Sequence, residues 1–203
     1  MIFVLVGREY SGKEDIAEAI YENYVAHNHD ISPLITYTTD SKRSEPFYCV
    51  REVEEMKNLE VELDDKIISL DGCDSEHHCW DYMMTLPDDF DPQKDYVVSA
   101  TLKNYHALVY YFENEYQDQK KPVEIVPIYI KISDYHWLKR AILLNKNNDL
   151  EDVCRRFLSE KEEKVDEKLE EMGFVDVYET TIFADPVDEI IEYIQAKTMR
   201  RMD

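Results

Sequence analysis

The hydrophobic positions of the chain alternate between short continuous runs and helical spacing. Residues 2–6, Ile-Phe-Val-Leu-Val, form an apolar run of the kind typical of a buried parallel strand. From Lys13 to Tyr24 the apolar side chains recur at helical spacing, which predicts an amphipathic helix. Four further runs predict strands: Leu34 to Tyr37, Tyr96 to Ala100, Val123 to Ile132 and Val175 to Tyr178. This alternation predicts an α/β fold with a mostly parallel sheet covered by helices.

The second half of the chain predicts further helices. Tyr135 to Leu144 and Leu150 to Met172 have helical spacing, and the acidic run from Ser159 to Met172 is interpreted as a solvated face. Between them, the polar residues 145–149 predict a loop. The last helix is expected to begin near Pro186, because proline is favoured at a first helical position.

The stretch between the second and third predicted strands breaks this rhythm, because it is acidic and rich in turn formers. We interpret the 203 residues as one domain, with a core of residues 1–38 and 93–203 and an inserted subdomain of residues 39–92.

Charge and cysteine content narrow the possible partners and the compartment. The net charge is −22, and such a field repels nucleic-acid phosphates, so we expect no nucleic-acid partner. No apolar stretch approaches the roughly 20 residues needed to cross a bilayer, and residues 1–6 have no leader-like pattern. The four cysteines lack a disulfide spacing, which favours a reducing compartment. We therefore expect a cytoplasmic protein without a membrane partner, as a monomer or homodimer.

A candidate anion site follows the first predicted strand. Residues 7–13, Gly-Arg-Glu-Tyr-Ser-Gly-Lys, have the spacing of a phosphate-binding loop. Gly7 and Gly12 let the backbone curl so that N–H groups face an anion, Lys13 adds a charge, and the following helix adds its positive dipole end. The alternative is a turn with a purely structural role. Glu14 stands where this motif ordinarily has a Ser or Thr hydroxyl for Mg²⁺, and its charge would repel a polyphosphate.

Several segments resemble the guanylate kinase family. Residues 36–43, Thr-Tyr-Thr-Thr-Asp-Ser-Lys-Arg, resemble its Ser-x-Thr-Thr-Arg-x-x-Arg segment, which grips a nucleoside monophosphate. Val126 to Leu144 resembles the strand and helix that lead to the family's lid, and Glu151 to Glu163 the helix that returns from it. Phe174 to Ile190 is similar to the closing strand and helix. The resemblance covers most of the chain and is weakest across residues 47–92.

The resemblance implies a P-loop nucleoside monophosphate kinase that uses ATP and Mg²⁺ to phosphorylate GMP or a similar nucleotide, under a lid at about residues 143–150. It implies no metal ligand from the protein. The implied roles are catalysis by Lys13, Arg140, Arg155 and Arg156; ATP binding by Gly7, Tyr10, Ser11, Gly12, Lys13, Glu14 and Thr180; and acceptor binding by Thr36, Thr39 and Arg43. Arginine suits these roles because its guanidinium binds phosphate oxygens in bidentate fashion. Alternatively, each arginine only balances an acidic helix face.

The sequence departs from the family pattern at several positions, of which Glu14, Asp40 and Thr101 motivate a second hypothesis. Asp40 replaces the first phosphate-gripping arginine, Thr101 an acidic residue, Asn104 a glycine, and Thr180 the asparagine that reads adenine. The second hypothesis is a catalytically impaired module that binds a nucleotide or a protein partner.

Two other groups of residues have competing interpretations. Cys73, His77, His78 and Cys79 could supply zinc ligands, but their spacing favours ordinary surface or pocket residues. The tyrosines at 105, 110, 111 and 116 have helical spacing, which favours packing in the core over a binding face. No Gly-x-Ser-x-Gly motif occurs, which disfavours a serine hydrolase.

Overall fold

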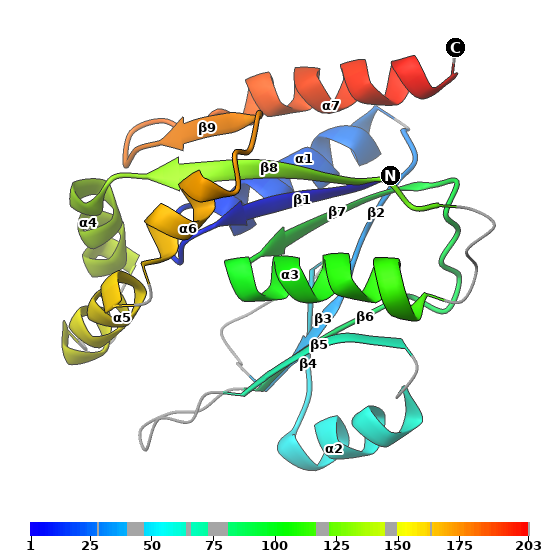
Figure 1. The fold of residues 1–203 in the computed structure, drawn as a ribbon, viewed down its shortest axis with the longest axis horizontal. Helices are drawn as coiled ribbons and strands as arrows, with labels where there is room; N and C mark the ends of the chain where they lie inside the picture. The colour runs from blue at the N-terminus through cyan, green and yellow to red at the C-terminus, as the bar shows by residue number, and fades with distance from the viewer. Residues whose placement is uncertain are drawn as a thin grey trace.

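A parallel five-stranded sheet forms the centre of the molecule (Figure 1). The computed structural model describes residues 1–27, 29–39, 47–63, 66–72, 81–116, 122–144, 150–162 and 164–202. The strand order is β2-β7-β1-β8-β9, and every neighbouring pair is parallel. The strands are β1 (Ile2–Gly7), β2 (Ile31–Pro33), β7 (Asp95–Ala100), β8 (Ile125–Ile132) and β9 (Val177–Thr180). The α/β fold class expected from the sequence is confirmed.

Helices cover both faces of this sheet, which is why β1 is a continuous apolar run. Phe3 and Leu5 face one layer, in which they pack with α1 (Lys13–Ala26) and α7 (Val187–Met202). Val4 and its neighbours at alternate positions face the other layer, with α3 (Leu102–Tyr110) and α6 (Val165–Glu171). Figure 1 shows α7 and α3 on opposite sides of the sheet. The core therefore lies on both sides of β1, and the loop after β1 is held at the middle of the sheet.

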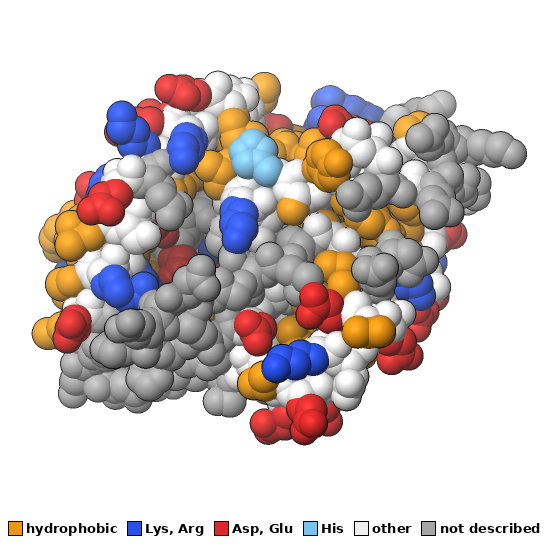
Figure 2. Space-filling view, turned by 60° about the horizontal axis from the view of Figure 1, so that its bottom comes forward, with side chains coloured by type: hydrophobic (Ala, Val, Ile, Leu, Met, Phe, Trp, Pro, Cys, Tyr) orange, Lys and Arg blue, Asp and Glu red, His pale blue; other side chains and the backbone are white. Residues whose placement is uncertain are grey.

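A second sheet lies beyond α3 in Figure 1. Its strand order is β4-β3-β6-β5, with β3 parallel to β4 and antiparallel to β6. Its elements are β3 (Thr36–Thr38), β4 (Tyr48–Val50), β5 (Ile67–Gly72) and β6 (Asp81–Thr85), and α2 (Val53–Glu62) joins β4 to β5. Most of it comes from the stretch that we interpreted as an insertion, and the proposed subdomain boundaries stay a prediction. In Figure 2, Lys and Arg side chains are scattered over the visible face rather than gathered in one patch.

Two predicted elements are wrong in their extent. The strand predicted for residues 34–37 begins only at Thr36, because the chain passes from the central sheet to the second sheet between Pro33 and Thr36, and the short strand β2 before it was not predicted. β2 pairs with β7 in the central sheet, whereas β3 pairs with β4 and β6 in the second. The long helix predicted for residues 150–172 is divided into α5 (Leu150–Glu162) and α6, with Lys164 between them in the left-handed conformation at φ 52°. Helix α4 (Asp134–Leu144) and the start of α7 after Pro186 agree with the predictions.

The tyrosine cluster belongs to the core with one exception. Tyr111 is buried, and Tyr105 and Tyr116 are partly buried against the same layer. Tyr110 is 57% exposed, so the core interpretation is wrong for this residue. Tyr110 is the last residue of α3, and Tyr111 begins the π-helical turn η2 (Tyr111–Glu115). Adjacent residues of a helix point about 100° apart, so one of the two can face the core while the other faces solvent. None of the helices in the described residues is both long and apolar enough to span a membrane.

Candidate phosphate-binding site

The loop between β1 and α1 has a backbone that only glycine permits at two points. A Cβ atom at Gly7 would lie 2.6 Å from the carbonyl oxygen of Ile130 in the neighbouring strand. Gly12 has φ +85°, and a Cβ there would clash with the guanidinium of Arg140. Tyr10 also has a positive φ, of 53°, and its ring packs edge-on against Trp137. The structure therefore forms the tight strand–loop–helix turn that the glycine spacing predicts.

Lys13 lies inside this turn rather than in solvent. Its side chain is 2% exposed, and Nζ donates to the carbonyl oxygen of Arg8 at 3.2 Å and pairs with Oε1 of Glu14 at 2.9 Å. Burial alone would lower the pKa of Lys13, but the Glu14 carboxylate outweighs burial, with help from Tyr48 and Glu9, and raises that pKa. Lys13 therefore carries its charge at neutral pH, with its own neighbour as counter-ion.

Arg8, which the sequence analysis did not single out, is the second buried cation of the loop. Its side chain is 2% exposed and lies against the rings of Trp137 and Phe157. Three carboxylates surround it: Glu160 at 2.7 Å from Nε, and Asp134 at 2.8 Å and Asp166 at 3.0 Å from Nη1. Burial disfavours the charge, but the hydrogen bonds that Arg8 donates to Asp134 and Glu160 outweigh burial and raise the pKa of Arg8. A basic residue directly after a buried strand was the available signal, but its partners are distant in sequence.

Besides the ion pair of Glu160 with Arg8, helix α5 makes two further polar contacts with the loop. Oε1 of Glu160 accepts a hydrogen bond from the backbone N–H of Glu9 at 2.9 Å, and Arg156 Nη1 donates to the Glu9 carboxylate at 2.7 Å. The side chain of Glu160 is only 14% exposed, so the interpretation of residues 159–172 as a solvated face is wrong at this position. Of the two arginines predicted on this helix, the structure brings Arg156 to the loop, whereas Arg155 is exposed.

Arg140 approaches the loop from α4. Its Nη2 donates to Asp185 at 2.5 Å, while its Nη1, packed against Gly12, is buried and has no hydrogen-bond partner among the described residues. The hydroxyl of Ser11 is likewise buried without a partner in that part of the chain. Thr180, expected to bind ATP, is 2% exposed and donates to the carbonyl oxygen of Ser11 at 2.8 Å. Two unsatisfied donors at Ser11 and Arg140 are the feature that fits an anion best.

Two of the predicted acceptor residues, Thr36 and Thr39, lie in β3 of the second sheet and directly after it. Thr36 is buried in β3, and the hydroxyl of Thr39 accepts a hydrogen bond from the backbone N–H of Asp81 at 2.9 Å. Arg43 lies outside the described residues, as do Asp40 and most of the predicted lid. Thr101 caps α3 by accepting from the backbone N–H of Asn104 at 3.3 Å, so its role in the structure is local.

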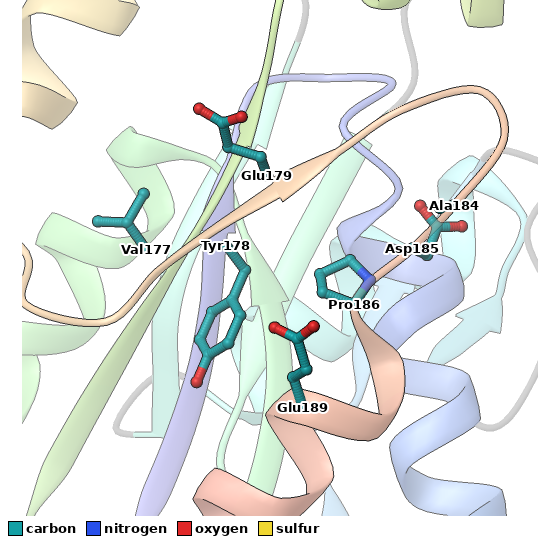
Figure 3. Close-up of a pocket in the computed structure, with 7 residues that line it drawn as sticks. All are labelled: Val177, Tyr178, Glu179, Ala184, Asp185, Pro186 and Glu189. Atoms are coloured by element: carbon teal, nitrogen blue, oxygen red, sulfur yellow. The ribbon is translucent and has the colours of Figure 1, made fainter.

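A hollow of about 400 Å³ lies beside β9 and the start of α7. Figure 3 shows the ring of Tyr178 and the carboxylate of Glu189 on the same side of Pro186. The lining residues are Val177, Tyr178, Glu179, Ala184, Asp185, Pro186 and Glu189. Three carboxylates and no basic residue line it, which is unsuited to a polyphosphate. The hollow is therefore a poor candidate for phosphate binding, and the loop stays the candidate site.

Among the residues that the structure describes, no group of three or more His, Cys, Asp or Glu side chains is placed so that it could hold a metal ion. Glu14 occupies the position of the usual hydroxyl ligand, and its carboxylate forms an ion pair with Lys13. The donor set of the loop therefore does not fit a resident Mg²⁺. The zinc candidates Cys73, His77, His78 and Cys79 lie outside the described residues.

Comparison with known proteins identifies the fold. No protein-family model matches the sequence, and no curated protein matches it. The structure is similar to the crystal structure of guanylate kinase from Anaplasma phagocytophilum, with a TM-score of 0.56 and 16% sequence identity. The match covers 98% of this chain and 86% of that chain. The chain therefore has a guanylate-kinase-like fold, as the resemblance of its segments predicted.

Proposed function

We propose that this guanylate-kinase-like protein binds ATP at residues 7–13 and transfers its γ-phosphoryl group to a nucleoside monophosphate such as GMP. The observation that carries the proposal is the pair of buried, unsatisfied donors, Ser11 Oγ and Arg140 Nη1, beside a glycine turn that already holds Lys13. Donors buried without a partner cost free energy, and phosphate oxygens would satisfy them. Lys13 and Arg140 are each paired with a carboxylate, Glu14 and Asp185, so the unsatisfied donors carry the proposal and not a surplus of positive charge.

The reaction needs positioning and charge compensation more than covalent chemistry. A phosphate oxygen of the acceptor attacks the γ-phosphorus, the bond from that phosphorus to the β–γ bridging oxygen breaks, and ADP leaves with the electron pair. Lys13 and Arg140 would stabilise the charge on the transferred group, with Arg155 and Arg156 approaching from α5. Backbone N–H groups of the loop, including Tyr10 and Gly12, would orient the ATP phosphates.

The acceptor would lie between the loop and the second sheet. Thr36, Thr39 and Arg43 are the proposed monophosphate ligands, by resemblance of residues 36–43 to the family segment. Tyr48 on β4 packs against the core layer that contains Ile16 of α1, which supports a position of this sheet next to the loop. Mg²⁺ enters the proposal only as the counter-ion that accompanies ATP, and no step depends on a protein ligand for it.

A second candidate is a catalytically impaired module that still binds a nucleotide or binds a protein partner. The Lys13–Glu14 ion pair favours it, because the lysine that would stabilise a phosphate is already neutralised. The contact of Glu160 with the backbone of Glu9 favours it as well. This candidate predicts binding without turnover.

A coupled assay with ATP and each common nucleoside monophosphate tests the first proposal. Lys13→Met should lower turnover by about 100-fold, the usual effect of removing one transition-state donor. Lys57→Met is the matched control, because Lys57 is exposed on α2. Equal rates for the wild type and Lys13→Met would contradict the enzyme proposal. Calorimetry with ATP then distinguishes the second candidate, which predicts heat of binding despite the absence of turnover.

A further inference from the structure

The carboxylate of Glu160 occupies donors of the kind that bind phosphate. Its Oε1 accepts from the backbone N–H of Glu9 at 2.9 Å, and its Oε2 accepts from Nε of Arg8 at 2.7 Å. A loop N–H beside a guanidinium is a typical anion site in proteins. Here the anion is supplied by the chain itself, from a residue 152 positions away from Arg8.

Glu160 differs from the other carboxylates around Arg8 in what it contacts. Asp134 and Asp166 pair with Nη1 of Arg8, and no contact of either with the loop backbone occurs among the described residues. Glu160 accepts hydrogen bonds both from the side chain of Arg8 and from the loop backbone at Glu9. Removal of Glu160 would therefore free a loop N–H while two carboxylates still neutralise Arg8.

The buried position of Glu160 disfavours the charged form of its carboxylate. Burial is the largest influence on Glu160 and raises its pKa, although the hydrogen bonds from Arg8 and from the backbone of Glu9 act in the opposite direction. A carboxylate kept in an unfavourable environment is displaced more easily than one that is fully stabilised. The second link from α5, between Arg156 and the Glu9 carboxylate, is only partly buried.

We propose that Glu160 is an internal competitor of the nucleotide phosphates, so that α5 must withdraw this carboxylate before the loop binds ATP fully. This inference rests on the proposed function and adds a way in which ATP binding at the same site is regulated. Two anions cannot accept from the same N–H at hydrogen-bond distance, and their charges repel each other. The apparent affinity for ATP is then the intrinsic affinity multiplied by the fraction of molecules in which Glu160 has left the loop.

Calorimetry of three probes, ATP, inorganic tripolyphosphate and adenosine, tests this competition. Glu160→Ala should bind ATP and tripolyphosphate at least about fivefold more tightly than the wild type, at the low end of usual coupling between sites. Adenosine affinity should not change, because adenosine has no phosphate to compete. Glu162→Ala is the matched control, since Glu162 is exposed at the end of the same helix.

The possible outcomes separate this inference from the proposed function. If the wild type and Glu160→Ala both bind ATP with equal affinity, the competition is overturned and the proposed function stands. If neither binds ATP or tripolyphosphate, the proposed function fails, and the competition fails with it. An equal gain for adenosine would also overturn the competition, because it would indicate a general opening of the site. If Glu160→Ala does not fold, Glu160→Gln replaces it, because glutamine keeps the volume and removes the charge. The same three affinities, for ATP, tripolyphosphate and adenosine, are then compared with those of the wild type.

Discussion

The ammonium group of Lys13 and the carboxylate of Glu14 form an ion pair of 2.9 Å at the first residues of α1. The lysine side chain is 2% exposed and the glutamate side chain 26% exposed. The pair therefore places a negative charge where a nucleotide would bring its own. In the proposed phosphate site, Lys13 would attract the nucleotide and the adjacent Glu14 would repel it.

Replacement of Glu14 by serine should strengthen ATP binding and weaken the fold. The change removes the repelling charge, supplies a hydroxyl, and frees Lys13 to interact with phosphate, so we expect about tenfold tighter ATP binding, equivalent to about 1.4 kcal/mol. Lys13 would remain buried without its carboxylate, which should lower the free energy of unfolding by about 1–3 kcal/mol. Calorimetry and urea denaturation measure the two effects.

Glu18→Ser is the matched control for this change, because Glu18 is exposed on the same helix. It should alter neither ATP affinity nor, by more than about 0.5 kcal/mol, stability. Unchanged ATP affinity in Glu14→Ser would show that the ion pair does not limit binding.

Gly12→Ala should destabilise the protein more than Gly173→Ala. Both glycines have positive φ, +85° and +64°, so each alanine incurs a conformational cost of about 1–2 kcal/mol. At Gly173 a Cβ would meet no heavy atom within 4 Å among the described residues, whereas at Gly12 it would clash with Arg140. We expect an additional loss of about 1–3 kcal/mol for Gly12→Ala, measured by urea denaturation. Equal losses would contradict the close packing of Arg140 on the loop.

Arg8→Met should be among the most destabilising changes in the described chain. The buried carboxylate of Glu160 would lose the guanidinium, whereas Asp134 and Asp166 keep Lys161, and removal of one side of a buried ion pair costs about 3–5 kcal/mol. Lys131→Met is the control, because its pair with Glu170 is exposed on both sides and should contribute less than about 1 kcal/mol. Thermal or urea unfolding compares the two. A loss below about 1 kcal/mol for Arg8→Met would show that the cluster is not structurally important.

The strand–loop–helix turn at residues 2–24 could be predicted because its signals are local. An apolar run, two glycines and helical spacing lie within one short segment, and the structure forms the expected elements there. The partners of the loop could not be predicted in this way. Arg8 and Glu160 are 152 residues apart, and a charged run such as residues 159–172 has the same pattern whether it faces solvent or a buried arginine.

Two elements were predicted with wrong limits for the same physical reason. The chain from Ile31 to Thr38 is one short strand-like run of apolar and polar residues, but whether it pairs with one sheet or two depends on distant strands, β7 and β6. The break at Lys164 has no glycine or proline to announce it, since a lysine adopts the left-handed conformation there. In both places, tertiary contacts override the local pattern.

Tyr24→Phe should stabilise the protein and make it less sensitive to alkali. Tyr24 on α1 is 4% exposed, and its hydroxyl has no hydrogen-bond partner in the described part of the chain. Removing an unsatisfied buried hydroxyl should raise the free energy of unfolding by about 1 kcal/mol.

Burial, with a smaller effect of Asp95, raises the pKa of Tyr24 from 10.0 to about 12. Because the folded state retains this proton longer than the unfolded state, the wild type should lose at most about 3 kcal/mol between pH 10 and 12, a loss that the variant avoids. Urea denaturation at both pH values measures the difference. Tyr96→Phe is the control, since the hydroxyl of Tyr96 accepts from the backbone N–H of Asp91 at 2.8 Å, and its removal should destabilise. A loss of stability in Tyr24→Phe as large as that in Tyr96→Phe would contradict an unpaired hydroxyl at Tyr24.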